Sequence, residues 1–337
     1  MASPIVDAHL DLASNVLGGR DYRLEIDEIR SAEHRTSEEC TVSLPELRRA
    51  HVAIAFATIM VMPERWDATG VPIYQAPPSI DARAQIAVYE SWQRDGLARI
   101  IRSRADLDVH LGLWARDDVL GLVLLMEGAD PIDQPADLPE WWRAGIRIIG
   151  PAWSMTRYAG GTDRPGGLTS AGRDLVAQMA EIGIAMDLSH MADAAFGESL
   201  DVGTHAVLAS HSNARSLVPT DRQLSDEMIV AIGSRGGVIG LNLYNEFIHP
   251  RWHHEGERPA VGLDDLRPHA EHIAGLIGWE RVGIGSDLDG GLGLEETPVE
   301  IGTVADIEKI CTIIPEAACV GVLGNNWIEW LRRVLPA

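Results

Sequence analysis

Short runs of apolar and β-branched residues recur along the chain, and a stretch with helical spacing of apolar positions follows each of them. The eight runs occupy residues 5–11, 52–61, 121–128, 146–153, 184–190, 205–212, 237–244 and 281–289. Most are apolar throughout rather than at alternate positions, which is typical of strands in a parallel sheet that is covered on both faces. Eight strand–helix units in succession favour a closed (β/α)8 barrel of the TIM type.

An open, doubly wound sheet is the alternative to a barrel. Such a sheet usually has a phosphate-binding glycine turn after its first strand, whereas this chain has His-Leu-Asp at that place. We therefore predict an α/β fold, a (β/α)8 barrel of the metal-dependent hydrolase type, as a single domain over residues 1–337. Residues 62–82 are rich in proline and glycine and are expected to form a loop over one face.

Helical patterns lie between the predicted strands at residues 43–50, 169–183, 225–236 and 263–278. Thr169 and Ser225 are suited to cap the starts of two of these helices, and Gly183 and Gly278 are suited to end two of them. Residues 320–335 are predicted to form a C-terminal helix that packs on the barrel through its apolar stripe.

The first predicted strand, IVDAHLDLAS, carries three ionisable residues on one face, since residues two apart in a strand point the same way. Later strands also end in ionisable residues, and a barrel builds its active site at these C-terminal ends. The candidates are Asp7, His9, Asp11, Glu127, His190, His211, Asp287 and Asp289. A lone histidine after a strand is usually structural, but five strand ends would each have to bury a charge without need. The set therefore predicts a metal site.

Three imidazoles with several carboxylates suit zinc, and they exceed the ligands that one catalytic zinc uses. The chain has a single lysine, Lys309, in a predicted helix near the C-terminus, which disfavours a carbamylated lysine as a bridge between two metals. Glu127 is central in the strand order and is the natural bridging ligand. Two metals about 3.5–4 Å apart can share a hydroxide and polarise a carbonyl, and that chemistry is hydrolysis.

The net charge and the composition disfavour several classes of binding partner. The chain has 50 acidic and 28 basic residues and a net charge of −22, which disfavours nucleic acid and anionic membranes. The longest apolar run, residues 52–62, is too short to span a membrane, and the N-terminus lacks a signal-peptide pattern, so a cytoplasmic protein is expected. The three cysteines, Cys40, Cys311 and Cys319, are expected to be buried thiols.

Seven motifs occur in an order that is similar to a known family. They are HLD (9–11), MEGAD (126–130), DLSHM (187–191), ASHSNAR (209–215), TDRQLSD (220–226), GSDLDGG (285–291) and LGNNW (323–327). From about residue 5 to the C-terminal helix, the chain resembles the renal, or membrane, dipeptidase family of zinc metallopeptidases, which are amidohydrolase-type barrels.

The resemblance implies two zinc ions per subunit and a dipeptide or similar small amide as substrate. By position, His9 and Asp11 would hold one ion, Glu127 would bridge, and His190 and His211 would hold the other. A bridging hydroxide would attack the amide carbonyl. Family members are often homodimers, so a homodimer is an expectation.

Three further residues take roles from the resemblance. Asp287 would carry the proton from the attacking water to the leaving amine. Arg222 would face the terminal carboxylate of the substrate, a task that suits the planar guanidinium group. Tyr244 resembles a tyrosine that reaches the same carboxylate, although it could equally be an aromatic residue packing a loop.

The chain departs from the family after the fourth strand. Trp153 occupies the place of a histidine that helps to hold the developing oxyanion, and an indole donates one hydrogen bond but cannot become a cation. Loss of an oxyanion donor typically costs on the order of 10²–10³ in turnover, unless a neighbour such as Arg157 or Tyr158 replaces it. The metal chemistry therefore carries over from the resemblance, but the substrate does not.

Other interpretations stay open. The same fold could hydrolyse a different amide or a lactam around Trp153, or it could bind a ligand without catalysis. A deaminase is disfavoured, because such barrels usually begin with His-x-His. Asp7 is expected to orient a metal ligand from outside, His269 and His272 to form structural hydrogen bonds, and the His-rich segment 249–257 to form a solvated lid or edge.

Overall fold

A parallel barrel forms the centre of the fold. The computed structural model describes residues 3–33, 38–67, 72–203 and 206–337. Its barrel strands are β1 (Ile5–Leu10), β2 (Val52–Met60), β6 (Leu120–Glu127), β7 (Ile146–Gly150), β10 (Ala185–Asp187), β11 (Val207–Leu208), β12 (Ile239–Leu241) and β13 (Val282–Ile284). They pair in the order β11-β10-β7-β6-β2-β1-β13-β12. All eight predicted runs contain a strand; position 205, at the start of one run, lies outside the described residues.

The two ends of this strand order meet and nearly close the barrel. Ala209 and Ile239 form a parallel bridge between the β11 and β12 regions. The Ala209 N–H donates to the Val238 carbonyl at 3.0 Å, and the Gly240 N–H donates to the Ala209 carbonyl at 2.8 Å. A Cβ at Gly240 would lie 1.9 Å from the Ser210 carbonyl oxygen, so only glycine fits this close approach. The predicted (β/α)8 architecture is confirmed.

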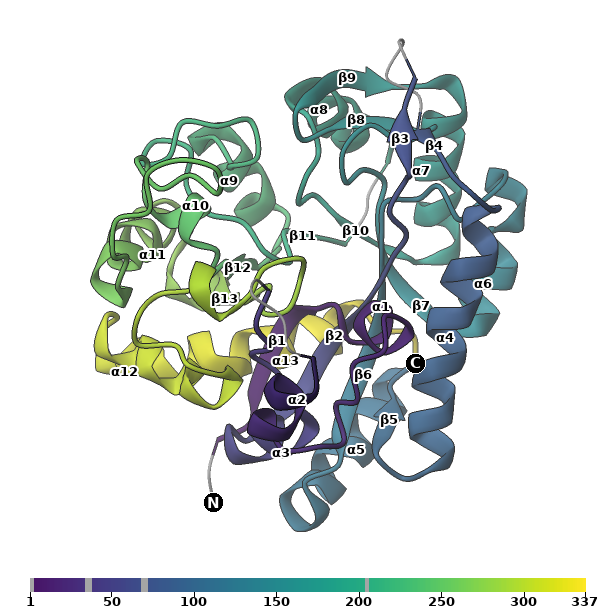
Figure 1. The fold of residues 1–337 in the computed structure, drawn as a ribbon. Helices are drawn as coiled ribbons and strands as arrows, with labels where there is room; N and C mark the ends of the chain where they lie inside the picture. The colour runs from purple at the N-terminus through teal and green to yellow at the C-terminus, as the bar shows by residue number, and fades with distance from the viewer. Residues whose placement is uncertain (1–2, 34–37, 68–71, 204–205) are drawn as a thin grey trace.

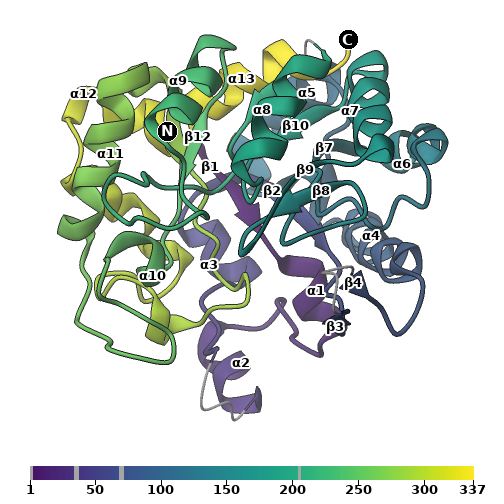
Figure 2. The same ribbon diagram turned by 90° about the horizontal axis from the view of Figure 1, so that it is seen from above.

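Helices surround the strands, as Figures 1 and 2 show. They are α1 (Leu12–Leu17), α2 (Ile26–Glu33), α3 (Leu44–Arg49), α4 (Pro78–Arg94), α5 (Arg104–Asp117), α6 (Leu138–Ala144), α7 (Ser170–Ile182), α8 (Asp193–Val202), α9 (Asp226–Ser234), α10 (Asn245–Ile248), α11 (Leu263–Ile277), α12 (Glu316–Val320) and α13 (Asn326–Val334). Short 3-10 turns cover Pro135–Asp137, Trp279–Arg281, Leu294–Glu296 and Val304–Thr312, and a π-helical turn covers Gly321–Asn325.

The predicted helix ends are confirmed. The Thr169 hydroxyl accepts from the Gly172 N–H at the start of α7, and the Ser225 hydroxyl accepts from the Met228 N–H at the start of α9. Such caps satisfy backbone donors that have no partner within the helix. Gly183 ends α7 in the left-handed conformation, with φ of 85°, which glycine adopts without strain.

The C-terminal helix α13 packs on the barrel as predicted. Its buried side chains include two tryptophans, Trp327 and Trp330. The Trp327 indole N–H donates to the Ile284 carbonyl of β13 at 3.0 Å, and that of Trp330 donates to the Val207 carbonyl of β11 at 3.1 Å. These polar contacts fix the apolar stripe of α13 against particular strands.

The loop predicted for residues 62–82 is only partly correct. The segment contains the hairpin of β3 (Arg65–Trp66) and β4 (Pro72–Ile73), and α4 already begins at Pro78; residues 68–71 lie outside the described residues. Two-residue strands are too short to show a period, and a proline at a helix start is pre-set for the helix. The strands β5 (Ala98–Ile100), β8 (Ala159–Gly161) and β9 (Arg164–Leu168) were also not predicted. β8 and β9 consist largely of glycine and proline, which are depleted in strands.

The prediction of three buried thiols is wrong for two of them. Cys40 is a buried free thiol, but Cys311 and Cys319 form a disulfide. The turn between the 3-10 helix Val304–Thr312 and α12 brings their Cα atoms within 5.2 Å, a proximity that spacing alone does not reveal. Disulfides are rare in the cytosol, so this pair does not support the expected cytoplasmic location, which stays a prediction. The expected homodimer also stays a prediction.

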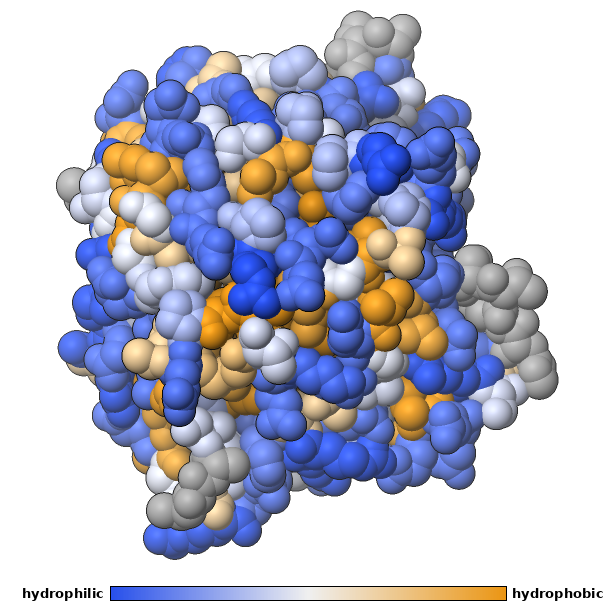
Figure 3. Space-filling view, turned by 90° about the vertical axis from the view of Figure 1, so that its left-hand side faces the viewer, coloured by the Kyte–Doolittle hydropathy of each residue, from blue (hydrophilic) through white to orange (hydrophobic). Residues whose placement is uncertain are grey.

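The surface is largely hydrophilic on the face that Figure 3 shows, with apolar patches between the polar side chains. Within the described part of the chain, no helix has both the length and the apolar character needed to cross a membrane.

Candidate metal centre

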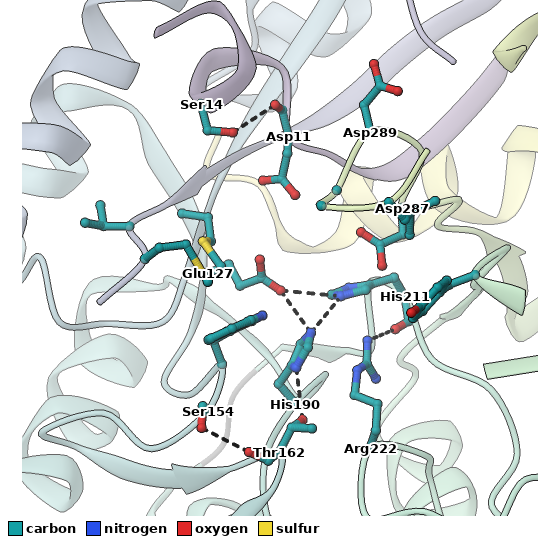
Figure 4. A pocket seen from close by; sticks show the side chains of 18 of the residues that line it. Asp11, Ser14, Glu127, Ser154, Thr162, His190, His211, Arg222, Asp287 and Asp289 are labelled. Atoms are coloured by element: carbon teal, nitrogen blue, oxygen red, sulfur yellow. Dashed lines mark hydrogen bonds and ion pairs between the residues drawn. The ribbon is translucent and has the colours of Figure 1, made fainter. Parts of the chain in front are cut away.

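Ionisable side chains from five strands meet at the C-terminal end of the barrel (Figure 4). His9 is in β1 and Asp11 follows that strand; Glu127 ends β6; His190, His211 and Asp287 each lie three residues beyond the ends of β10, β11 and β13. All of these side chains are buried or nearly so. The structure therefore brings the five predicted metal ligands and Asp287 together in one place.

Glu127 stands between two groups of ligands. Its Oε1 lies 3.2 Å from His190 Nε2 and 3.4 Å from His211 Nε2, and these two nitrogen atoms are 3.0 Å apart. Its Oε2 lies 3.5 Å from His9 Nε2, which is 3.7 Å from Asp11 Oδ2. One carboxylate thus presents a different oxygen to each group.

These distances fit metal coordination. Ligands about 2.0–2.1 Å from a tetrahedral zinc are roughly 3.3 Å from one another, close to the separations around Glu127 Oε1. Among the described residues, His9 Nε2, Asp11 Oδ1 and Glu127 Oε1 are buried polar atoms without a hydrogen-bond partner. Such atoms are costly unless a ligand satisfies them. The residues present can therefore hold metal ions, in the groups His9, Asp11, Glu127 and Glu127, His190, His211.

The electrostatics of the centre also favour cations. Burial opposes ionisation of Glu127, but His9 and His190 outweigh it and hold the pKa of the carboxyl below its usual range. Burial lowers the pKa of His190 to about 4, with Arg222 adding to the effect, and it also lowers that of His211. His190 and His211 are therefore neutral, the state in which imidazole binds a metal. Burial lowers the pKa of His9, but Glu127 and Asp11 outweigh it and raise the pKa above its usual value, so a cation between these carboxylates would displace a proton from His9.

Ser210 orients the histidines from behind. Its hydroxyl donates its one hydrogen to Asp187 Oδ2 at 2.5 Å, so it can only accept from His211 Nδ1 at 2.6 Å. His9 Nδ1 lies 3.4 Å from the same oxygen. With its hydrogen on Nδ1, His211 keeps the lone pair of Nε2 free toward Glu127. One hydroxyl therefore supports histidines of both groups.

Asp187 and Ser210 form one of two equivalent Asp–Ser pairs. Asp187 Oδ1 accepts from the N–H groups of Ser189 and Ser210, and Oδ2 from the Ser210 hydroxyl. On β1 and after β13, Asp7 Oδ1 accepts from the N–H groups of His9 and Ser286, and Oδ2 from the Ser286 hydroxyl. Each pair joins neighbouring strands just before a site residue. Asp7 lies on the same face of β1 as His9, but its carboxylate is used in these hydrogen bonds to His9 and Ser286 and does not face the centre.

Asp287 occupies a strained and tightly enclosed position. It has a left-handed backbone with φ of 64°, and its Oδ2 accepts from the Asn242 amide at 2.9 Å while Oδ1 lies 3.9 Å from His9 Nε2. A Cβ at Gly290 would lie 2.0 Å from Oδ1, so glycine is required there. Burial raises the pKa of Asp287 to about 7, against the influence of His9. Strain and a shifted pKa are typical of catalytic groups.

Asp289 has a different part in the structure. Its carboxylate accepts from the Tyr22 hydroxyl at 2.8 Å and from the Thr41 N–H at 2.7 Å, and it pairs with Arg20 at 2.9 Å. Although it is only two residues from Asp287, it ties the N-terminal segment to the turn after β13. The sequence does not distinguish these two aspartates.

A large pocket opens above the centre, with a volume of about 1070 Å³. Arg222 lines it; its Nη atoms donate to the Ser212 hydroxyl at 3.0 Å and the His211 carbonyl at 2.6 Å, and its buried Nε has no partner among the described residues. Tyr244 also lines the pocket, and its hydroxyl donates to Glu246 at 2.9 Å. Trp153 lines the pocket beside His190.

Comparison with known proteins decides the family. The sequence profile of the family described as Membrane dipeptidase (Peptidase family M19) matches residues 1–333. The chain belongs to the M19 dipeptidase family. It is therefore a metal-dependent hydrolase, and the resemblance seen in the sequence motifs is confirmed.

Relatives of this M19 chain agree with that assignment. An uncharacterised protein of Klebsiella pneumoniae is 31% identical over 254 residues, which cover 71% of this chain and 90% of that protein. An uncharacterised dipeptidase of Schizosaccharomyces pombe is 33% identical over 247 residues, covering 68% of this chain and 57% of its relative.

Two solved structures have the same fold. The M19 metallopeptidase named dipeptidase AC aligns over 100% of both chains, with a TM-score of 0.83 and 25% identity. A metallopeptidase from Rhodobacter sphaeroides, liganded with a phosphinate mimic of the dipeptide L-Ala-D-Ala, aligns with a TM-score of 0.81 and 25% identity over 99% of this chain and 100% of its own.

Several sequence expectations about this M19 site are now resolved. Arg157 and Tyr158, considered as replacements for the missing histidine, do not line the pocket in the described structure: Arg157 pairs with Asp130, and the Tyr158 hydroxyl donates to the Ile132 carbonyl. That expectation is wrong because both side chains are held by these other partners, and Tyr158 is buried away from the pocket lining. His269 and His272 form hydrogen bonds away from the centre, as expected.

The sequence reasoning missed the residues that support the ligands, namely Thr162, Asp187, Ser210, Asn242 and Ser286. Thr162 contacts His190 Nδ1 at 3.0 Å. One signal was available: Ser210 and Ser286 each directly precede a candidate site residue at the end of a strand. A small polar residue in that place is suited to support the ligand beside it.

Proposed function

We propose that this M19 enzyme is a binuclear zinc dipeptidase, with His9 and Asp11 holding one ion, His190 and His211 the other, and Glu127 bridging. The observation that carries the proposal is the division of Glu127, whose Oε1 faces two histidines while Oε2 faces His9. Three imidazoles with two carboxylates form a donor set that zinc prefers. A bound zinc pair supplies a hydroxide nucleophile at neutral pH and polarises the scissile carbonyl.

Asp287 moves the proton in this proposal. Its Oδ2 is held by Asn242, which leaves Oδ1 toward His9 to accept a proton from the attacking water. Burial raises the pKa of Asp287 and so favours its protonated form, and the carboxyl that has taken up the proton can then return it to the leaving amine.

Arg222 binds the terminal carboxylate of the substrate. Its Nη contacts use two of the five N–H donors and fix the guanidinium, so the Nε–H and the second N–H of each Nη remain as donors for the carboxylate. Tyr244 would add a second contact if its hydroxyl exchanges Glu246 for the substrate. The bound L-Ala-D-Ala mimic in the Rhodobacter sphaeroides relative supports a dipeptide with a free carboxylate as the substrate. We therefore propose L,D dipeptides as well as L,L dipeptides as substrates.

A screen of zinc-reconstituted protein over L,L and L,D dipeptides tests the proposal, with metal content measured on the same samples. We expect two zinc ions per chain and hydrolysis of at least one class of dipeptide. After chelation, we expect loss of the zinc and loss of the hydrolysis. Two bound ions without hydrolysis of any dipeptide would contradict the dipeptidase assignment and favour another amide or a lactam. Active protein with one ion would contradict the binuclear centre.

A further inference from the structure

The lining of the pocket includes large apolar side chains, in contrast to the polar centre. We call five of them the apolar lobe: Leu17, Met60, Met62, Trp66 and Trp153, of which Met60, Trp66 and Trp153 also lie together around a smaller cavity. Leu17 is 51% exposed and Met62 is 56% exposed, so two large apolar side chains that line the pocket are accessible to solvent. Apolar side chains gathered at a concave surface are typical of a ligand-binding site.

The apolar lobe reaches from the metal centre outward. The Trp153 ring lies 6.1 Å from the His190 ring, and Trp66 stacks on Trp153 with ring centroids 6.3 Å apart and 21° between the planes. The Arg164 guanidinium lies 4.6 Å from the Trp66 ring. The two indoles thus form a continuous aromatic wall that starts beside a candidate metal ligand.

The segment that carries Trp153 is tied to the centre. The Thr162 N–H donates to the Trp153 carbonyl at 3.1 Å, the Ser154 hydroxyl donates to the Thr162 carbonyl at 3.1 Å, and the Thr162 hydroxyl contacts His190 Nδ1 at 3.0 Å. Trp153 is therefore held in a fixed relation to His190. A pre-organised wall costs less entropy on binding than a mobile one.

The place of Arg222 sets the direction of the substrate. Figure 4 shows Ser154, the neighbour of Trp153 in the chain, and Arg222 on opposite sides of His190. With the terminal carboxylate at Arg222 and the scissile amide at the metal centre, the N-terminal residue of the dipeptide extends toward the apolar lobe. The pocket volume of about 1070 Å³ slightly exceeds the roughly 300–1,000 Å³ usual for ligand sites, so a large side chain has room.

We propose that the apolar lobe binds the side chain of the N-terminal residue of the substrate and selects a large apolar or aromatic one. The inference rests on the proposed dipeptidase function. Burial of a leucine- or phenylalanine-sized side chain should raise kcat/KM by roughly 10–100-fold over glycine. Trp66 and Met62 are then specificity residues, and Trp153 serves the substrate side chain rather than the oxyanion.

The test is a series of dipeptides that differ only in the first residue, Gly-Ala, Ala-Ala, Leu-Ala and Phe-Ala, with the second residue in the configuration that the wild type favours. In the wild type we expect kcat/KM to rise 10–100-fold from the first to the last. In W66A the rise should shrink at least fivefold, and in M62A, where an exposed side chain carries little risk to folding, at least twofold. V109A, which alters a 61% exposed residue of α5 outside the pocket lining, is the control and should keep the wild-type ratio.

Binding to zinc-loaded D287N, measured by calorimetry with Ala-Ala and Phe-Ala, separates the two proposals. Preference for Phe-Ala of at least tenfold supports the lobe even if turnover is slow. Equal binding of both dipeptides, or an unchanged Phe-Ala to Ala-Ala ratio of kcat/KM in both W66A and M62A, overturns the lobe and leaves the dipeptidase function standing. Binding of neither, with no hydrolysis by the wild type, overturns both.

Discussion

Two sets of buried histidines show what distinguishes the candidate metal ligands in this molecule. His110 on α5 and His269 on α11 lie between helices and the barrel, and each bonds to the backbone, His110 through one ring nitrogen and His269 through both. His110 Nε2 donates to the Ala53 carbonyl at 2.9 Å; His269 accepts from the Ala214 N–H at 3.1 Å and donates to the Ile248 carbonyl at 3.1 Å. Burial lowers the pKa of each to about 4, as it does for His190 at the barrel mouth.

Burial and a low pKa therefore do not distinguish the two sets. At the barrel mouth, His190 and His211 use Nδ1 for a hydroxyl and keep Nε2 toward a carboxylate, whereas His269 uses both nitrogens on the backbone. A free nitrogen alone is not the difference, since His110 Nδ1 also has no hydrogen-bond partner among the described residues. The difference is the Glu127 carboxylate that the free nitrogens of His190 and His211 face, and the hydroxyls behind these two rings support that orientation.

The largest expected effect concerns Asp287, the carboxylate that faces these histidines. D287N keeps the shape of the side chain but cannot accept a proton, so kcat should fall by about 10³-fold, within the range for general acid–base catalysis. Zinc content, measured by elemental analysis, should stay near that of the wild type. Unchanged turnover would remove Asp287 from the mechanism, and loss of metal would make it a ligand instead.

Removal of the support behind the histidines should have the next largest effect. S210A leaves His211 Nδ1 and Asp187 without the hydroxyl between them, so zinc affinity should fall about 10–100-fold in competition with a chelator. S234A is the matched control, because that hydroxyl donates to the Ala231 carbonyl at the exposed end of α9. Equal affinities in S210A and the wild type would mean that backbone geometry alone orients the ligands.

The smallest effect is expected at His269 and concerns stability. Its pKa is about 4 in the folded protein and about 6.5 when unfolded, so the unfolded state binds the extra proton between these values. Stability is therefore lost as pH falls from about 6.5 to 4, and at pH 5 the loss is about 2 kcal/mol. H269Q cannot titrate. The free energy of unfolding is measured with urea on metal-free protein at pH 7.5 and at pH 5. Between these two pH values, H269Q should lose about 2 kcal/mol less than the wild type. Parallel losses in the two proteins would contradict the buried neutral state of His269.

A single physical property, the parallel arrangement of the strands, made both the barrel and the positions of the candidate metal ligands predictable from the sequence. Parallel strands covered on both faces are apolar throughout, and such runs stand out; the residues at their ends then converge, because all strands run the same way. This placed Glu127 beside His9 although they are far apart in the chain. Residues whose role depends on a partner across space were not predictable: Cys311 gave no sign of its disulfide, Asp289 looked like Asp287, and Trp66 gave no sign that it stacks on Trp153.

The two Asp–Ser pairs have a consequence for how the enzyme acquires its metals. Asp7 with Ser286, and Asp187 with Ser210, fix the ligand-bearing turns through hydrogen bonds that contain no metal. We therefore expect the barrel mouth to form without metal and the proposed ions to bind to a folded site. Metal could then be removed and replaced in the native protein, and the metal content would follow the ions available rather than those present at synthesis.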